Sequence, residues 1–159
     1  MGCDIHAFAE RKVGDRYEVI KGEKFSDGEG PFHWRSYGVF GFLAGVRNYS
    51  AIPPIAPDRG IPDDVSDEVA ARVAGYGFDG HSHTWVAVDE LSAFNYDAAF
   101  EDRRVTRQVG PRVFDGGQTA DAGGGSMTTF REFLGEMFFD DLALLKKIGA
   151  DRVVFFFDN

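Results

Sequence analysis

A run of five large apolar residues, 153–157, is the feature that most constrains the fold. Successive side chains of a strand point to opposite faces, so a strand without polar alternation is covered on both faces. Such a strand lies inside a sheet. The run therefore predicts a central strand, and we expect its neighbour to be the first strand of the chain.

Residues 3–10 alternate strictly between two kinds of side chain, which predicts a strand with two different faces. Cys3, Ile5, Ala7 and Ala9 form the apolar face, and Asp4, His6, Phe8 and Glu10 form the other. Gly14 and Asp15 predict a turn, so residues 3–20 are expected to form a hairpin.

Helical spacing and capping residues predict helices over 36–46, 66–77 and 129–149, with a brief one over 89–94. Residues 103–114 predict one strand or a bent pair around Gly110 and Pro111, and 115–126 predict a Gly-rich mobile loop. Together these elements predict a single α+β domain over 1–159. We expect a mixed or antiparallel sheet packed against two to three helices.

Charge and composition exclude several classes of protein. With 17 basic and 26 acidic side chains the net charge is −9, which argues against a DNA or RNA polymer as partner. The sequence contains no run of 18 apolar residues, so it predicts no membrane span. Its single cysteine excludes an intrachain disulfide. These features predict a soluble, cytoplasmic protein, and they are compatible with a homo-oligomer.

Two pairs of side chains could carry chemistry. Asp4 and His6 are two residues apart on a predicted strand, so both point the same way, and a carboxylate beside an imidazole fixes its tautomer. His81 and His83 repeat this spacing, which predicts both imidazoles on one side. We take these four as candidate catalytic residues. Each pair is equally compatible with an ordinary polar strand edge or turn.

Four further residues are candidates for binding a substrate: Arg47, Asn48, Arg59 and Trp85. An arginine in a stiff, Pro-rich loop is preorganised for a phosphate or carboxylate, and a tryptophan can stack on a base. For Arg59 the competing interpretation is a salt bridge to Asp63 or Asp64 that fixes the loop.

A metal-dependent version of the site is also open. Asp4, His6, His81 and Asp158 would then hold a divalent ion, zinc or manganese, that activates water. The sequence does not choose between this version and metal-free acid–base chemistry.

Several motifs resemble an uncharacterised family of small bacteriophage and prophage proteins. They are the opening Met1-Gly2-Cys3-Asp4-Ile5-His6, the internal Val46-Arg47-Asn48, Arg59-Gly60-Ile61-Pro62 and Asp79-Gly80-His81-Ser82, and the terminal Phe157-Asp158-Asn159. The resemblance implies a phage accessory protein in the cytoplasm of a bacterial host. Such proteins often counter host defences that signal through cyclic nucleotides or ADP-ribose derivatives.

Three functional hypotheses follow. The first is a small hydrolase that cuts a phosphodiester or related bond in a nucleotide-like signal. The second is a binding protein that sequesters such a molecule without cutting it. The third is a protein–protein inhibitor of a host target, in which the 16 phenylalanines include an exposed patch.

Overall fold

The computed structural model describes residues 2–109 and 112–159, with side chains described outside 106–116. The fold is α+β, as the sequence predicts, and every strand pairing in this part of the chain is antiparallel. The chain divides into two compact units built from separate segments. The first comprises Met1–Arg35, Ala56–Phe94 and Glu136–Asn159, and the second comprises Ser36–Ile55 and Asn95–Gly135. The single domain expected over residues 1–159 stays a prediction.

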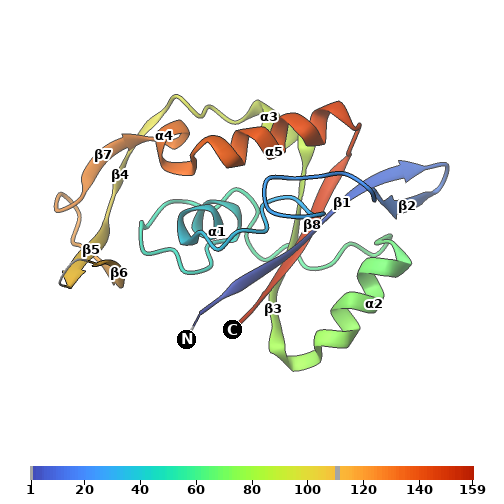
Figure 1. The fold of residues 1–159 in the computed structure, drawn as a ribbon, viewed down its shortest axis with the longest axis horizontal. Helices are drawn as coiled ribbons and strands as arrows, with labels where there is room; N and C mark the ends of the chain where they lie inside the picture. Colours follow the sequence, from blue (N-terminus) through green and yellow to red (C-terminus); the bar gives the residue numbers. More distant parts are fainter. Residues whose placement is uncertain (1, 110–111) are drawn as a thin grey trace. The chain divides into compact units, whose positions relative to one another are not determined.

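The first unit is built on a four-stranded sheet in the order β2-β1-β8-β3 (Figure 1). Its strands are β1 (Asp4–Val13), β2 (Arg16–Val19), β3 (Gly80–Ala87) and β8 (Arg152–Asp158). The last strand lies between β1 and β3, and its residues 152–157 are buried. The predictions of a central strand beside the first strand and of an N-terminal hairpin are both confirmed.

The two faces of this sheet differ as the alternation predicts. Cys3, Ile5, Ala7 and Ala9 are buried on one face, where Phe155 and Phe157 of β8 add two fully buried rings. Burying each such ring contributes roughly 1.5–3 kcal/mol. The other face carries Asp4, His6 and Phe8, which are exposed or half-buried.

Helix α2 (Asp67–Tyr76) packs on the face that carries Phe8. The Arg72 guanidinium of this helix lies 5.6 Å from the centroid of the Phe8 ring. The helix begins as predicted: the Ser66 hydroxyl accepts a hydrogen bond from the Val69 amide. At its other end α2 passes into the short 3₁₀ helix η1 (Gly77–Asp79), which leads directly into β3.

A buried ion pair fixes the start of α2 to the sheet. Glu10 of β1 is fully buried and accepts from Arg152 Nε at 2.8 Å and from the Ser66 amide at 2.9 Å. Arg152 also donates to Asp64 Oδ1 at 2.9 Å and lies over the Tyr17 ring at 3.5 Å. The carboxylate of Glu10 thus joins β8, β1 and the N-cap of α2.

The first unit also contains α3 (Val88–Ala93) and α5 (Glu136–Lys147). The helix predicted over 129–149 is wrong in one respect. Gly135, at φ 83°, ends α4 (Phe130–Leu134), and α5 starts at the next residue. The predicted start is confirmed, since the Thr129 hydroxyl accepts from the Glu132 amide.

The second unit contains α1 (Tyr37–Ala44), α4 and two two-stranded sheets. The pairs are β4 (Ala99–Asp102) with β7 (Ser126–Thr129), and β5 (Arg104–Val109) with β6 (Arg112–Thr119). The loop predicted over 115–126 is therefore shorter, because β6 continues to Thr119. The bend predicted at Gly110 and Pro111 lies outside the described residues.

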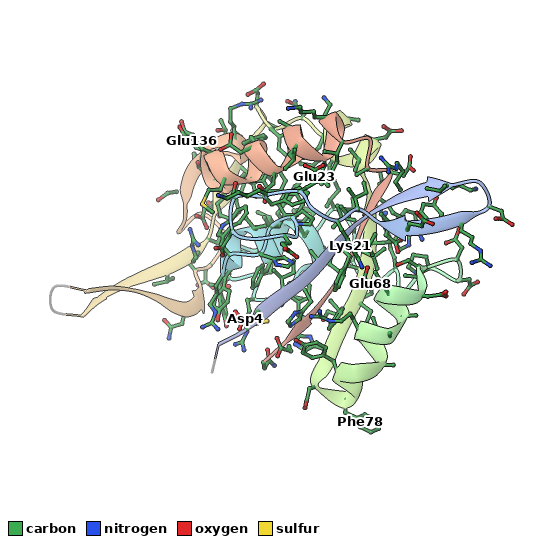
Figure 2. All side chains as sticks on the ribbon, turned by 45° about the vertical axis from the view of Figure 1, so that its right-hand side comes forward. Asp4, Lys21, Glu23, Glu68, Phe78 and Glu136 are labelled. Carbon is green, nitrogen blue, oxygen red and sulfur yellow. The ribbon has the colours of Figure 1, made fainter. Side chains whose placement is uncertain are left out.

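Among the described residues no helix combines the length and the apolar character needed to cross a bilayer. Of the phenylalanines whose side chains are described, only Phe78 is largely exposed; it lies in η1, beyond the end of α2 (Figure 2). The exposed phenylalanine patch expected for a protein–protein inhibitor is not found in this part of the chain.

Candidate active site

His6 forms a hydrogen-bonded pair with Asp158. Antiparallel pairing of β1 with β8 puts His6 opposite Phe156 and Asp4 opposite Asp158, so these side chains share one face of the sheet. The His6 Nε2 atom lies 2.9 Å from Asp158 Oδ1, and the two side chains are 19% and 29% exposed. A carboxylate can only accept, so this contact places the imidazole proton on Nε2.

Tyr76, the last residue of α2, lies against the other nitrogen of His6. Its hydroxyl oxygen is 3.4 Å from His6 Nδ1, and the two ring centroids are 4.4 Å apart. With the proton on Nε2, Nδ1 is left to accept from the Tyr76 hydroxyl. Asp158, His6 and Tyr76 therefore form one chain of hydrogen bonds that a proton can follow.

Asp4 does not partner His6, contrary to expectation. Its carboxylate instead accepts two hydrogen bonds from Arg35, from Nε to Oδ1 and from Nη2 to Oδ2, both at 2.9 Å. The bonds to Arg35 lower the pKa of the Asp4 carboxyl. Asp158, which enters from the neighbouring strand, takes the place predicted for Asp4.

His81 and His83 stack on different residues of β8, so the expectation that both imidazoles point to one side is wrong. A bulge in β3 between His81 and Thr84 inserts one extra residue, with Ser82 at φ 55°. His81 stacks on Phe157, and its ring nitrogens contact Ser82 Oγ at 3.0 Å and Asn159 Oδ1 at 3.3 Å. Phe156 and Phe157 are consecutive, and their side chains point to opposite faces.

His83 remains on the face of the sheet that carries His6. The Phe156 ring stacks on both imidazoles, at 5.1 Å from His6 and 5.4 Å from His83, and so separates them. Burial lowers the pKa of His83, and the neighbouring His81 lowers it further. His83 Nε2 is buried and has no hydrogen-bond partner among the described residues. Burial and the absence of a partner on Nε2 both favour the neutral imidazole.

The predicted metal set is not assembled. Among the described residues no three His, Cys, Asp or Glu side chains are grouped so that they could hold a metal ion. Asp4 is occupied by Arg35, and His81 stacks on the ring of Phe157 instead of lying beside His6. The geometry of Asp4, His6, His81 and Asp158 thus disfavours the metal version of the site.

Arg59 and Trp85 contact each other, and their contacts are internal. The Arg59 guanidinium makes two hydrogen bonds of 2.8 Å to Glu90 and lies 5.1 Å from the centre of the Trp85 ring. These bonds lower the pKa of the Glu90 carboxyl. A salt bridge does fix this loop, but to Glu90 instead of Asp63 or Asp64.

Arg47 and Asn48 belong to the second unit and are engaged locally. Asn48 donates to Ile52 O at 2.7 Å and accepts from the Ile52 amide at 3.2 Å, which closes a turn. Arg47 Nη1 lies 3.4 Å from the Tyr49 hydroxyl. Nothing in these contacts supports the predicted role in substrate binding.

His33 covers part of the free edge of β1. The buried Asp141 carboxylate accepts from the Ser26 and Phe32 amides, at 2.8 and 2.9 Å, and so holds the loop that carries His33. His33 Nε2 lies 3.0 Å from Ala7 O and 3.2 Å from Ala7 N, and burial lowers the pKa of this imidazole. The neutral ring donates to the Ala7 carbonyl with its proton on Nε2, or accepts from the Ala7 amide with its proton on Nδ1.

A pocket of about 300 Å³ adjoins His6. It is lined by β1, the loop of His33 and α2, with Lys21, Glu68 and Arg72 among its polar residues. Lys21 and Glu68 form an ion pair at 2.9 Å (Figure 2). Arg72 lies over Phe8 and makes no ion pair with any described carboxylate, so its charge is available to an anion.

Tyr76 and Arg72 are site residues that the sequence motifs do not single out. They are four residues apart on α2, and helical residues with this spacing lie on the same face. The available signal was an arginine and a tyrosine on a helix whose other residues after Glu68 are Val, Ala and Gly. No family model, curated protein or solved structure matches this chain.

Proposed function

We propose that this protein is a small hydrolase that cuts a phosphodiester or related bond in a nucleotide-like molecule by metal-free acid–base chemistry. The observation that carries the proposal is His6, whose two nitrogens contact Asp158 at 2.9 Å and Tyr76 at 3.4 Å. Asp158 orients the ring and stabilises it when it gains a proton. His6 then moves a proton between the reacting hydroxyl and the leaving oxygen.

Two cations, Lys21 and Arg72, and two carboxylates, Glu29 and Glu68, line the pocket beside His6, and Arg72 is the group placed to bind a small anion. Arg72 provides a cation without a carboxylate partner among the described residues, and guanidinium groups bind phosphate oxygens through paired hydrogen bonds. A volume of about 300 Å³ is at the lower end for small-molecule sites. Because the protein has a net charge of −9, a small ligand suits it better than a nucleic-acid polymer does.

In this proposal the protein works in the cytoplasm of a bacterial host as a phage accessory protein. The resemblance of its motifs to phage and prophage proteins supports this setting. Destroying a nucleotide signal would protect a phage from a defence that depends on that signal.

The proposal is tested by incubating the protein with cyclic dinucleotides and ADP-ribose derivatives and identifying the products by mass spectrometry. We expect products from the wild type and at least about a 10²-fold loss for His6→Gln. His81→Gln is the matched control, because His81 stacks on Phe157 and has no part in the proton path. A chelator should leave the rate unchanged.

Three results would overturn the proposal. One is full turnover by His6→Gln, and a second is loss of wild-type turnover on chelation. The third is recovery of the intact ligand after heating, which would identify a protein that sequesters its ligand.

A further inference from the structure

A carboxylate, an imidazole and a hydroxyl are arranged around His6 in the order found where a histidine activates a catalytic nucleophile. A carboxylate holds one imidazole nitrogen, and the other nitrogen faces a hydroxyl, as in acyl-transfer triads. Here the hydroxyl belongs to Tyr76, 3.4 Å from His6 Nδ1. Such contacts are often longer without substrate than in the reacting complex.

The same contacts argue against water as the first nucleophile. Both nitrogens of His6 are engaged, Nε2 by Asp158 and Nδ1 by Tyr76. A water molecule could give its proton to Nδ1 only by displacing the Tyr76 hydroxyl. The group that His6 is placed to deprotonate is therefore Tyr76.

The Tyr76 ring is held in place on two sides. Its centroid lies 4.4 Å from the His6 ring and 5.1 Å from the Phe156 ring, which it meets edge-on. A Cβ atom added at Gly80 would lie 3.3 Å from Tyr76 Cβ, so the backbone of β3 approaches the tyrosine closely. A nucleophile needs this kind of fixed approach.

Arg72 lies one turn before Tyr76 on the same face of α2, and residues with this spacing lie roughly 5–6 Å apart at Cβ. Both residues line one pocket beside α2, where the Arg72 guanidinium can hold a phosphoryl group and stabilise the charge that develops during attack. The pairing favours a phosphate ester over a carboxylic ester as substrate.

We propose that Tyr76 is the nucleophile of the proposed hydrolase and forms a phosphotyrosyl intermediate; this inference rests on the proposed function. The Tyr76 oxygen bonds to phosphorus while the bond from phosphorus to the leaving oxygen breaks. The Tyr76 proton passes to His6 Nδ1 and then to the leaving oxygen. In the second half, water attacks phosphorus, gives its proton to His6, and Tyr76 leaves and recovers that proton.

The test uses bis(4-nitrophenyl) phosphate, whose nitrophenol product is coloured. We expect a burst of about one nitrophenol per protein molecule, followed by slower turnover. Acid quenching should leave a 4-nitrophenyl phosphate adduct that peptide mass spectrometry places on Tyr76. Tyr76→Phe keeps the ring contacts with His6 and Phe156, so it should fold normally, and it should lose at least about 10³-fold in rate along with the adduct.

The outcomes separate this inference from the function on which it rests. If wild-type protein turns the probe over in a His6-dependent way, but Tyr76→Phe keeps the rate or no adduct forms on Tyr76, the nucleophile assignment is wrong and the hydrolase proposal stands. If wild-type protein does not turn over this probe or the nucleotides, both fail. A melting curve for Tyr76→Phe that matches wild type excludes misfolding as the cause of lost activity.

Discussion

Replacing Arg152 by methionine should remove the charge partner of a fully buried carboxylate. Glu10 is 0% exposed and Arg152 is 6% exposed, and their contact is 2.8 Å. Breaking a buried pair by removing one partner costs about 3–5 kcal/mol, because the remaining charge is left without compensation. We expect Arg152→Met to lower the free energy of unfolding by about this amount.

The other contacts of Arg152 add little to this figure. Asp64 is 58% exposed, and ion pairs with exposed partners are worth about 0–1 kcal/mol. Methionine can keep part of the packing on Tyr17, which the guanidinium covers at 3.5 Å. Domains of this size are stable by about 5–15 kcal/mol, so the loss should lower the melting temperature by roughly 6–20 °C.

The control is a double variant, Glu10→Gln with Arg152→Met. A neutral amide at position 10 can still accept from the Ser66 amide but leaves no buried charge, so most of the lost stability should return. Urea titration followed by tryptophan fluorescence measures the wild type and both variants. A cost below about 1 kcal/mol for Arg152→Met, or a double variant no more stable than Arg152→Met alone, would refute the reasoning.

Three further predictions concern the site. Burial lowers the folded-state pKa of His83, so the unfolded chain binds a proton at this residue more readily than the folded chain does. The contribution of His83 to the free energy of unfolding is therefore full above about pH 6.5 and is lost as the pH falls through the folded-state pKa. His83→Gln should therefore lose less stability than wild type between pH 7 and pH 5 in urea titrations, and an equal loss would contradict this. Asp4→Asn should change the unfolding free energy by less than about 1 kcal/mol, because the pair with Arg35 is exposed, and should leave turnover intact. Gly80→Ala should slow turnover while barely changing the melting temperature, since the added methyl lies 3.3 Å from Tyr76 Cβ; an unchanged rate would show that this approach has no role.

The sheet of the first unit could be predicted because its signals are local and strong. Residues 153–157 have no polar alternation, and residues 3–10 alternate between apolar and polar side chains except at Phe8. Both patterns are found in the burial of β8 and β1. The cap at Ser66 also acts within its own turn. In each case the residues that carry the signal are those that form the structure.

The arrangement of the site depends on facts that are not local. The bulge at Ser82 inserts one residue into β3, so His81 and His83 lie on opposite faces of the sheet. Nothing intrinsic to serine requires the φ of 55° at this position. Arg35 captures Asp4 only because the loop before α1 returns to β1. The pairing of His6 with Asp158 follows from the β1–β8 register, which was expected as a neighbour relation but without residue partners.

The helix break at Gly135 shows a different limit. The apolar stripe continues across 130–148, and a glycine within a helical pattern usually costs only about 1 kcal/mol. Here Gly135 has a φ of 83°, so the chain ends one helix and starts another. The apolar stripe indicates which residues are buried. It does not indicate that α4 is buried in the second unit and α5 in the first.

The most direct test of the central claim is the protonation of the His6 ring, measured by ¹⁵N NMR of imidazole-labelled protein where this ring is neutral. The account predicts a proton on Nε2, held by Asp158, and a bare Nδ1 that accepts from Tyr76; in Asp158→Asn the Nε2 tautomer should lose its preference. A neutral His6 with its proton on Nδ1, or a spectrum unchanged by Asp158→Asn, would contradict the account.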